Sequence, residues 1–455
     1  MIAPFRCTPV SRARFSHDPD ILRGLASDAL AHARAKGASA CEIEVSDGYG
    51  QTVTVRKAAV ETIEYNRDKS LSVSVYLGRQ KGHANTADLA PRAIRDTVDA
   101  ALAIARFTAV DEAAGLPDPQ ELARESKDLD LFHPWDLPVE HAIEIAKSCE
   151  SAAFALDRRV VNSEGASVSC QHWHFILANS DGFMDGFPTS RHSISCAVIA
   201  AENGQMQRDD WYVSQRAPGD LPRPEAVGDY AGRRALARLR SRKIGTVQAP
   251  VLFEAPVANG LLGQFVSAVS GGSLYRKASF LLDSLGKQVF SPIVTVLERP
   301  HLPRGQASSW FDDEGVATRD RDVVRNGVLQ GYFLGSYSAR KLGMKTTGSA
   351  GGNHNLVLEG GELDFPGLIR KMGRGLLVTE LLGHGVNLVT GDYSRGAAGY
   401  WVEGGEIRHP VEEITIAGNL RDMFRSIVAI GADALTRGSR TCGSVLLEGM
   451  TIAGN

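Results

Sequence analysis

Residues 378–419 read VTELLGHGVNLVTGDYSRGAAGYWVEGGEIRHPVEEITIAGN and contain seven glycines between positions 383 and 405. Glycine at this density indicates backbone with positive φ, or close approach by another segment of chain. Gly404-Gly405, which follow Tyr400-Trp401-Val402, are typical of a two-residue hairpin turn. The pattern predicts strands joined by tight turns.

A polar cluster lies between two of these glycines. The guanidinium of Arg395 can donate two parallel hydrogen bonds to a carboxylate, or bridge carbonyl groups. Ser394 suggests a serine hydrolase, since His384 and Asp392 are near in sequence, but the local GDYSRG lacks the G-x-S-x-G elbow. We therefore predict no catalytic residue here, and interpret the cluster as a peptide-binding or interface loop. It consists of Gly391, Asp392, Tyr393, Ser394, Arg395 and Gly396.

The chain of 455 residues is long enough for two or three domains of roughly 150 residues each. Of its 47 glycines, 33 lie from Gly245 onward, so the composition changes near that residue. Four prolines between residues 115 and 138 indicate a connector. We expect a disordered extension over 1–19, an α+β domain over 20–114, the connector over 115–138, a central α+β domain over 139–244 and a β-rich domain over 245–455.

Hydrophobic periodicity gives the fold class, which is α+β: a two-part N-terminal α+β region followed by a glycine-rich, mainly antiparallel C-terminal domain. Apolar residues recur at helical spacing over 20–36, 90–106, 139–156, 230–243, 259–269 and 366–372. Alternation with a period of two predicts strands over 42–45, 52–55, 62–65, 71–77, 168–178 and 191–200.

Charge and cysteine content restrict the partners and the compartment. The net charge of −3 gives no general attraction to nucleic acid, and no apolar run reaches the roughly 18 residues that span a bilayer. The five arginines of 230–243 spread around much of a helix, which favours a solvated or inter-domain face over a nucleic-acid site. Six scattered cysteines without a C-x-x-C spacing favour a reducing cytoplasm.

Cys170, His172 and His174 alternate along one predicted strand and therefore share a face, which His192 and Cys196 could oppose. A metal site is one interpretation, although histidines on a half-polar strand face are far more often structural. Cys170 and Cys196 could face each other across a hairpin, but burial as small apolar side chains is the default.

Several long blocks carry a family resemblance. They are SGGSLYRKASFLLDSLGKQVFS, SSWFDDEGVATRDRDVV, SYSARKLGMKTTGSAGG and the terminal CGSVLLEGMTIAGN, together with 378–419. In this order the blocks resemble the TldD/PmbA family, and specifically its PmbA (TldE) branch. The resemblance covers roughly residues 20–455. It implies a subunit of a cytoplasmic, heteromeric zinc metallopeptidase that cleaves unfolded or leader peptides.

The resemblance also implies where the zinc lies. In the TldD branch the first helix of the C-terminal domain carries H-E-x-x-x-H, which supplies metal ligands and a general base. The corresponding PVANGLLGQFVSAVSGGSLYRK, residues 256–277, has neither histidine nor glutamate, and no histidine of this chain is followed by glutamate. We therefore expect no metal on this chain and zinc on a TldD-type partner. The competing hypotheses are a stand-alone binding protein of the gyrase-modulator type and a homodimeric hydrolase.

Overall fold

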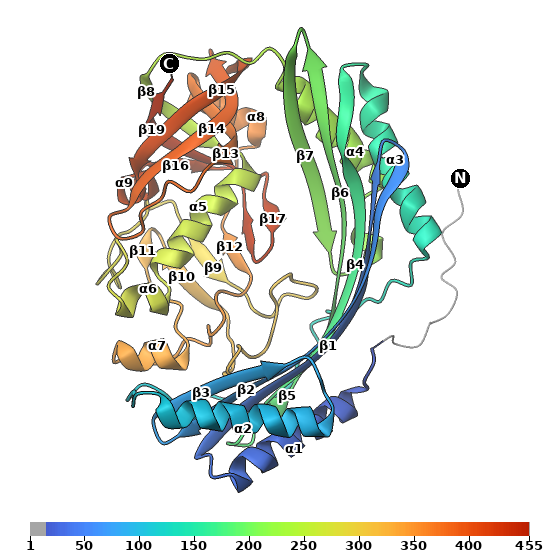
Figure 1. Cartoon of the computed structure of the whole chain (residues 1–455). Helices are drawn as coiled ribbons and strands as arrows, with labels where there is room; N and C mark the ends of the chain where they lie inside the picture. Colours follow the sequence, from blue (N-terminus) through green and yellow to red (C-terminus); the bar gives the residue numbers. More distant parts are fainter. Residues whose placement is uncertain (1–14, 455) are drawn as a thin grey trace.

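Residues 15–454 are described by a computed structural model of the chain. A long, curved sheet forms one side of the molecule, and a glycine-rich C-terminal unit lies opposite its inner face (Figure 1). The described residues are α+β, as predicted. The sheet has the strand order β3-β2-β1-β4-β6-β7, with β5 paired to β4. Its strands are β1 (Ala40–Arg56), β2 (Ala59–Leu77), β3 (Gln80–Thr86), β4 (Val160–Asn179), β5 (Met184–Asp185), β6 (Pro188–Glu202) and β7 (Gln205–Gln215).

Helices cover the outer face of this sheet in two groups, and each group closes its own core. Apolar residues of α1 (Pro19–Ala35) and α2 (Pro91–Phe107) pack on one end of β1, β2 and β4. Those of α3 (Val139–Leu156) and α4 (Pro224–Ala237) pack on the other end of β1 and on β4 and β6. The predicted short strands in 42–77 are parts of two long ones, and β1 pairs antiparallel with β4 from Glu42↔Asn179 to Val55↔Ala166. One sheet therefore joins both N-terminal regions, while the proposed domain boundaries stay a prediction.

The C-terminal unit contains two further six-stranded sheets around a large apolar core. Helix α5 (Ala255–Ala268) lies in this core, and the Gly404-Gly405 turn joins β14 (Asp392–Glu403) to β15 (Glu406–Asn419) as predicted. Its other helices are α6 (Gly271–Tyr275), α7 (Ser336–Lys341), α8 (Phe365–Met372) and α9 (Leu420–Arg425). Its other strands are β8 (Val247–Phe253), β9 (Val296–Glu298), β10 (Arg321–Arg325), β11 (Val328–Leu329), β12 (Leu356–Leu358), β13 (Gly375–Leu382), β16 (Ile427–Ile430), β17 (Leu435–Arg437), β18 (Arg440–Cys442) and β19 (Val445–Ala453).

The predicted basic helix over 230–243 is wrong at both ends. Helix α4 begins at Pro224, where proline suits the first turn, and ends at Ala237. Arg240 beyond it has φ of +63° and pairs with Glu202. Several of these arginines bind carboxylates rather than lining one helical face, so the segment lies at a junction between the units.

Arg234 is the centre of this junction. Its Nε donates to Asp209 of β7 at 3.0 Å, and its Nη1 donates to Glu254, just before α5, at 2.8 and 3.0 Å. Arg238 pairs with Glu380 of β13 at 2.5 Å. A largely buried ion-pair network thus ties the curved sheet to the C-terminal unit.

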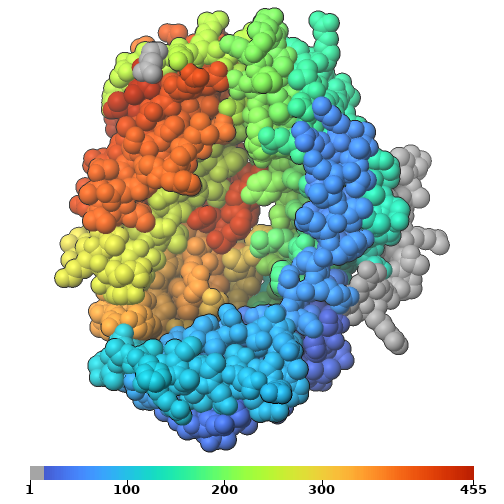
Figure 2. Space-filling view, viewed as in Figure 1, coloured from blue at the N-terminus to red at the C-terminus, as the bar shows by residue number. Residues whose placement is uncertain are grey.

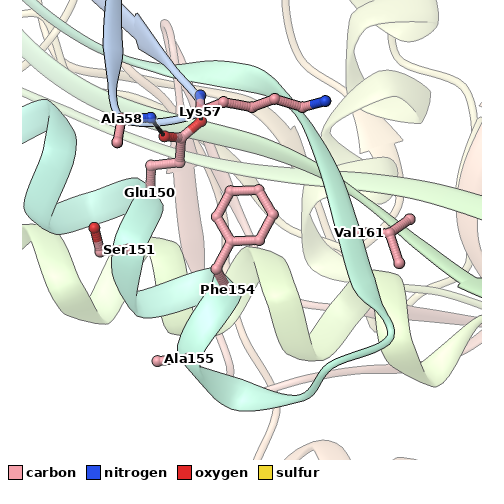
Figure 3. A pocket seen from close by; sticks show the side chains of 7 residues that line it. All are labelled: Lys57, Ala58, Glu150, Ser151, Phe154, Ala155 and Val161. Atoms are coloured by element: carbon pink, nitrogen blue, oxygen red, sulfur yellow. Dashed lines mark hydrogen bonds between the residues drawn. The ribbon is translucent and has the colours of Figure 1, made fainter.

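The hairpin between β1 and β2 turns at Lys57 and Ala58, which both have positive φ without being glycine. Their backbone N–H groups both donate to the carboxylate of Glu150 on α3, each at 2.8 Å (Figure 3). Glu150 is only 2% exposed. A charge-assisted pair of bonds therefore offsets the strain of a turn that usually requires asparagine or glycine.

We expect Glu150→Gln to lower the free energy of unfolding by about 1–3 kcal/mol, because an amide can accept only one of the two bonds and leaves the other N–H unsatisfied. Urea denaturation measures the effect. Glu144→Gln, an exposed change on the same helix, is the matched control and should stay within about 0.5 kcal/mol of the wild type. Equal midpoints for Glu150→Gln and Glu144→Gln would contradict the role of Glu150.

Most of the predicted N-terminal extension, residues 1–14, lies outside the described residues. Phe15 packs against Tyr49 with ring centroids 5.2 Å apart, and His17 donates its backbone N–H to Asp47 at 2.8 Å. Helix α1 begins directly afterwards, at Pro19. None of the helices in residues 15–454 is long and apolar enough to cross a membrane.

Candidate functional site

A hollow separates the curved sheet from the C-terminal unit, and the hairpin of β17 and β18 is visible inside it (red in Figure 2). The part of the inner face formed by residues 52–54 of β1 and 167–169 of β4 presents hydroxyl side chains to this space. Thr52 and Ser169 share a hydroxyl hydrogen bond of 3.0 Å, and Thr54 and Ser167 share one of 2.8 Å. Such a wall offers hydrogen bonds without a strong charge, which suits a polar chain of variable sequence.

A cavity of about 280 Å³ opens where the inner face of the sheet meets two loops of the C-terminal unit. Phe175 of β4, Phe187 just before β6 and Phe311 of a loop form an aromatic wall, with centroids 4.9 to 6.0 Å apart. The cavity is lined by Glu44, Phe175, Leu177, Phe187, Thr189, Arg216, residues 306–309, Phe311, Asp312, Asp313 and residues 350–354.

Carboxylates gather on one part of this cavity. Glu44 of β1 and Asp313 of the loop both line the cavity. Burial and then the charge of Asp313 raise the pKa of Glu44. Burial raises the pKa of Asp313, with a smaller contribution from the charge of Glu314 and against the opposing charge of His354. Burial raises the pKa of Asp312 to about 7, although its oxygens accept three backbone N–H bonds. Asp312 can therefore hold a proton near neutral pH.

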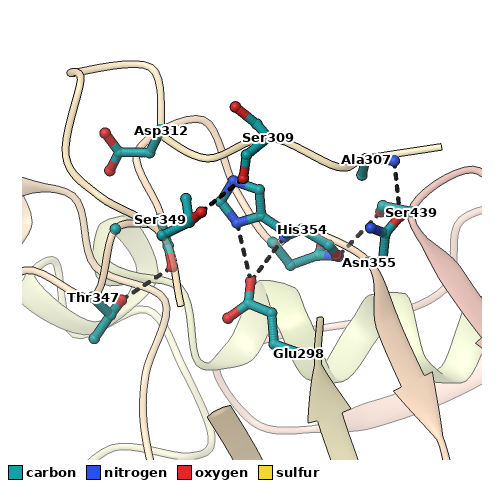
Figure 4. A network of polar contacts seen from close by, with 12 residues as sticks. Glu298, Ala307, Ser309, Asp312, Thr347, Ser349, His354, Asn355 and Ser439 are labelled. Atoms are coloured by element: carbon teal, nitrogen blue, oxygen red, sulfur yellow. Dashed lines mark hydrogen bonds and ion pairs between the residues drawn. The ribbon is translucent and has the colours of Figure 1, made fainter. Parts of the chain in front are cut away.

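A polar network fixes the loop 349–355 that closes the cavity (Figure 4). Glu298 of β9 accepts the backbone N–H of His354 at 2.8 Å and the Nε of Arg321 at 2.6 Å. Burial alone would raise the pKa of Glu298, but the bonds from His354 and the charge of Arg321 hold that pKa below its ordinary value. Asn355 accepts the N–H of Ala307 at 2.9 Å, which joins the two loops. The cavity is therefore preformed.

The predicted segment 391–396 lies elsewhere in the C-terminal unit. It is not a loop: Asp392 to Gly396 begin β14, and Tyr393 pairs with Gly418 of β15. Tyr393 is 2% exposed, whereas Asp392 and Ser394 point to solvent. The alternation of buried and exposed side chains that marks a strand could not be recognised in the sequence, because the glycines of this segment have no side chain to compare. None of the six residues lines the cavity, and their role as a binding or interface segment stays a prediction.

The serine-hydrolase alternative finds no support in the described residues, since no hydrogen bond joins the hydroxyl of Ser394 to a histidine there. Among the described residues, the side chain of Arg395 donates only from Nε to the carbonyl of Leu382, at 3.4 Å. Within residues 15–454 it forms no ion pair with Asp392 or Glu403. The guanidinium is half-exposed and available to a partner.

Cys170, His172 and His174 do share one buried face of β4. His172 accepts the backbone N–H of Trp135 at Nε2, and burial lowers the pKa of His174. Cys170 and Cys196 do not face each other, because Cys170 pairs with His192 and Cys196 lies four rows away opposite Ala166, next to Cys149 of α3. Both are buried, which was the default interpretation. No three His, Cys, Asp or Glu side chains in residues 15–454 are spaced to hold a metal.

Helix α5 occupies the position at which the resemblance places the zinc motif. Its side chains include no imidazole, thiolate or carboxylate, and Leu261, Leu262 and Phe265 are buried in the core. Asn259 donates to the carbonyls of Ala255 and Leu435. These residues do not fit a zinc ion, which needs nitrogen, sulfur or carboxylate ligands.

Comparisons with known proteins now identify the family. Sequence models match residues 41–105 as PmbA/TldA metallopeptidase domain 1, residues 132–239 as the central domain and residues 246–454 as the C-terminal domain. The chain belongs to the PmbA/TldD family. It is 50% identical to the metalloprotease PmbA of Escherichia coli O157:H7 over 95% of this chain and 96% of the relative.

This chain is less similar in sequence to a relative from the TldD branch than to the PmbA relative. A TldD homologue from Haemophilus influenzae is 27% identical over 70% of this chain and 69% of its own length. Among solved structures, a candidate modulator of DNA gyrase from Bacteroides thetaiotaomicron superimposes with a TM-score of 0.91 at 29% identity, covering 96% of this chain and 99% of the other. TldE from Thermococcus kodakarensis shares the fold, with a TM-score of 0.78 at 18% identity, over 96% of this chain and 99% of its own.

Sequence reasoning missed the cavity. Its residues come from positions 44 to 354 and carry no local motif. The acidic run of residues 312–314 and the Gly351-Gly352 pair were visible in the sequence, but nothing there placed them beside Glu44.

Proposed function

We propose that this chain is the PmbA/TldE-type subunit of a heteromeric zinc metallopeptidase in the cytoplasm, which cleaves unfolded or leader peptides. The observation that carries the proposal is the preformed cavity between the curved sheet and the C-terminal unit, in a chain whose relatives are named metalloproteases. Zinc, its ligands and the general base come from a TldD-type partner, because helix α5 offers no ligands. This chain contributes a wall of the substrate channel and part of the assembly interface.

The residues of the hollow suit an extended peptide. An extended backbone can pair with a strand edge and needs no particular side chain for affinity. Serine and threonine hydroxyls of the inner face can bond to carbonyl and N–H groups, while the cavity accepts a side chain or a chain end. A folded substrate has no free backbone for such bonds, so unstructured segments are preferred.

Mixing this chain with a TldD-type chain from the same genome is expected to produce cleavage of unstructured peptides that a chelator abolishes. Alone, this chain should bind less than one zinc per molecule by elemental analysis and leave casein intact, because it positions neither metal nor activated water. One tightly bound zinc per isolated chain would overturn the proposal. Equal cleavage with and without this chain would also count against it.

A stand-alone modulator is the alternative, and the naming of two solved relatives as candidate modulators of DNA gyrase favours it. That hypothesis predicts binding to another macromolecule with no gain in peptidase activity. Co-purification separates the two, since the first requires a second chain that bears H-E-x-x-x-H.

A further inference from the structure

A buried arginine lines the cavity, and its hydrogen-bond partners within residues 15–454 are all uncharged carbonyl groups. Arg216 follows β7 and is 7% exposed. Its Nε donates to the carbonyl of Gly305 at 3.4 Å, Nη1 to that of Ser190 at 3.1 Å and Nη2 to that of Gln306 at 2.7 Å. A guanidinium has five N–H groups, so these three bonds leave two of them for a further acceptor.

A second guanidinium strengthens the positive charge at this point. Arg191 of β6 donates from Nη2 to the same carbonyl of Gln306, at 3.3 Å. Neither arginine forms an ion pair with a carboxylate anywhere in residues 15–454. Burial, and then the charge of Arg191, lowers the pKa of Arg216 to about 10, so the guanidinium is still charged at neutral pH. A buried charge is normally paired, and an unpaired one is costly unless a ligand supplies the counter-charge.

The neighbours of Arg216 restrict the ligand. Phe175, Phe187 and Phe311 form the aromatic wall of the same cavity, which suits an apolar or aromatic side chain. Glu44 and Asp313 line the cavity without pairing with Arg216, so their negative charge disfavours a ligand with several acidic groups. A single carboxylate attached to an apolar residue satisfies these conditions.

We infer that Arg216, supported by Arg191, binds a peptide carboxylate whose neighbouring side chain packs against the aromatic wall of the cavity. The carboxylate is either the free C-terminus of a substrate or product, or the side chain of an aspartate or glutamate. This assignment rests on the proposed function for the peptide nature of the ligand. It adds a chemical preference that the proposed function does not contain.

Isothermal titration calorimetry of the full-length chain tests the inference without a partner. The probes are the peptide Gly-Ser-Ala-Phe with a free carboxylate, the same peptide amidated, and amidated Gly-Ser-Glu-Phe. We expect a peptide with a carboxylate to bind roughly 10- to 100-fold more tightly than the amide that lacks one, the range of a charge-assisted bidentate bond. Preference for the first peptide identifies a chain end, and equal binding of the glutamate peptide identifies a side chain.

Substitutions assign the preference to Arg216. Arg216→Met should bring the affinities for acid and amide together, and Arg216→Lys should restore part of the difference, because lysine keeps the charge without the fork. Arg223→Met, an exposed arginine before α4, is the control and should keep the wild-type ratio. If Arg216→Met fails to fold, the acid-to-amide ratio of the wild type still decides. A ratio near one, or no binding of any probe, overturns the inference and leaves the peptidase proposal to its own test.

Discussion

Replacing Arg234 with methionine is expected to lower the free energy of unfolding by about 3–5 kcal/mol, the range for breaking a buried ion pair from one side. Arg234 forms ion pairs with both Asp209 and Glu254, and the carboxylates of both are largely buried. Methionine fills the space but leaves Glu254 without an ion-pair partner among residues 15–454, and leaves Asp209 with only the longer pair to Arg238, at 3.6 Å. Urea unfolding followed by tryptophan fluorescence measures the loss, and Trp211 lies 5.5 Å from the guanidinium.

The same variant should show a pH dependence of known sign. Burial raises the pKa of Glu254 and Arg234 opposes that rise, so removing Arg234 raises this folded-state pKa further. A raised pKa means that the folded state holds its proton more tightly than the unfolded chain does. Stability is therefore lost as the pH rises from the ordinary glutamate value, and the defect should be smaller at pH 5 than at pH 8.

The adjacent Arg233 supplies the control for this prediction. It is 66% exposed and pairs with Asp229 on the same helix, so Arg233→Met should change the free energy of unfolding by less than about 0.5 kcal/mol. Unfolding of Arg234→Met at the same urea concentration as Arg233→Met would show that the junction does not stabilise the chain.

Replacing Arg395 with alanine is expected to impair the assembled enzyme and spare the isolated chain. The side chain has one long bond to its own protein, 3.4 Å to Leu382, so little folding stability depends on it. At a desolvated contact with a partner or peptide the loss is about 2–4 kcal/mol, or on the order of 30- to 1,000-fold in affinity or rate.

Thermal melting of the isolated chain, measured beside reconstituted cleavage, tests this separation. Arg408→Ala changes another exposed arginine, near the turn of the same β14–β15 hairpin, and should leave both readouts unchanged. A lower melting temperature for Arg395→Ala would mean that the residue stabilises its own strand. Full peptidase activity of the assembly with Arg395→Ala would show that Arg395 has no role in peptide binding or assembly.

Local periodicity predicted the elements that pack by one face. The helix over 139–156 has the predicted bounds, and that over 90–106 is shifted by one residue at each end, since each has an apolar stripe against the sheet. The four short strands predicted over 42–77 are two long ones, because exposed residues such as Arg67 and Asp68 continue the strand beyond its apolar part.

Errors arose where residues distant in sequence determine the structure. Helix α4 ends at Ala237, six residues before the predicted end at Lys243, because the arginines that follow bind Glu202 and Glu380. The cavity depends on Glu44, Arg216 and Asp313, which meet only once the curved sheet faces the C-terminal unit. No local pattern encodes such a meeting.

The shared sheet limits how the family's segments can be recombined. The boundary between the spans that match domain 1 and the central domain falls in a connector, yet fourteen residue pairs join β1 on one side of it to β4 on the other. A chimaera with its crossover in this connector would pair β1 from one parent protein directly with β4 from the other. Such exchanges should succeed only when both strands come from the same parent, so the two N-terminal segments have to be exchanged together.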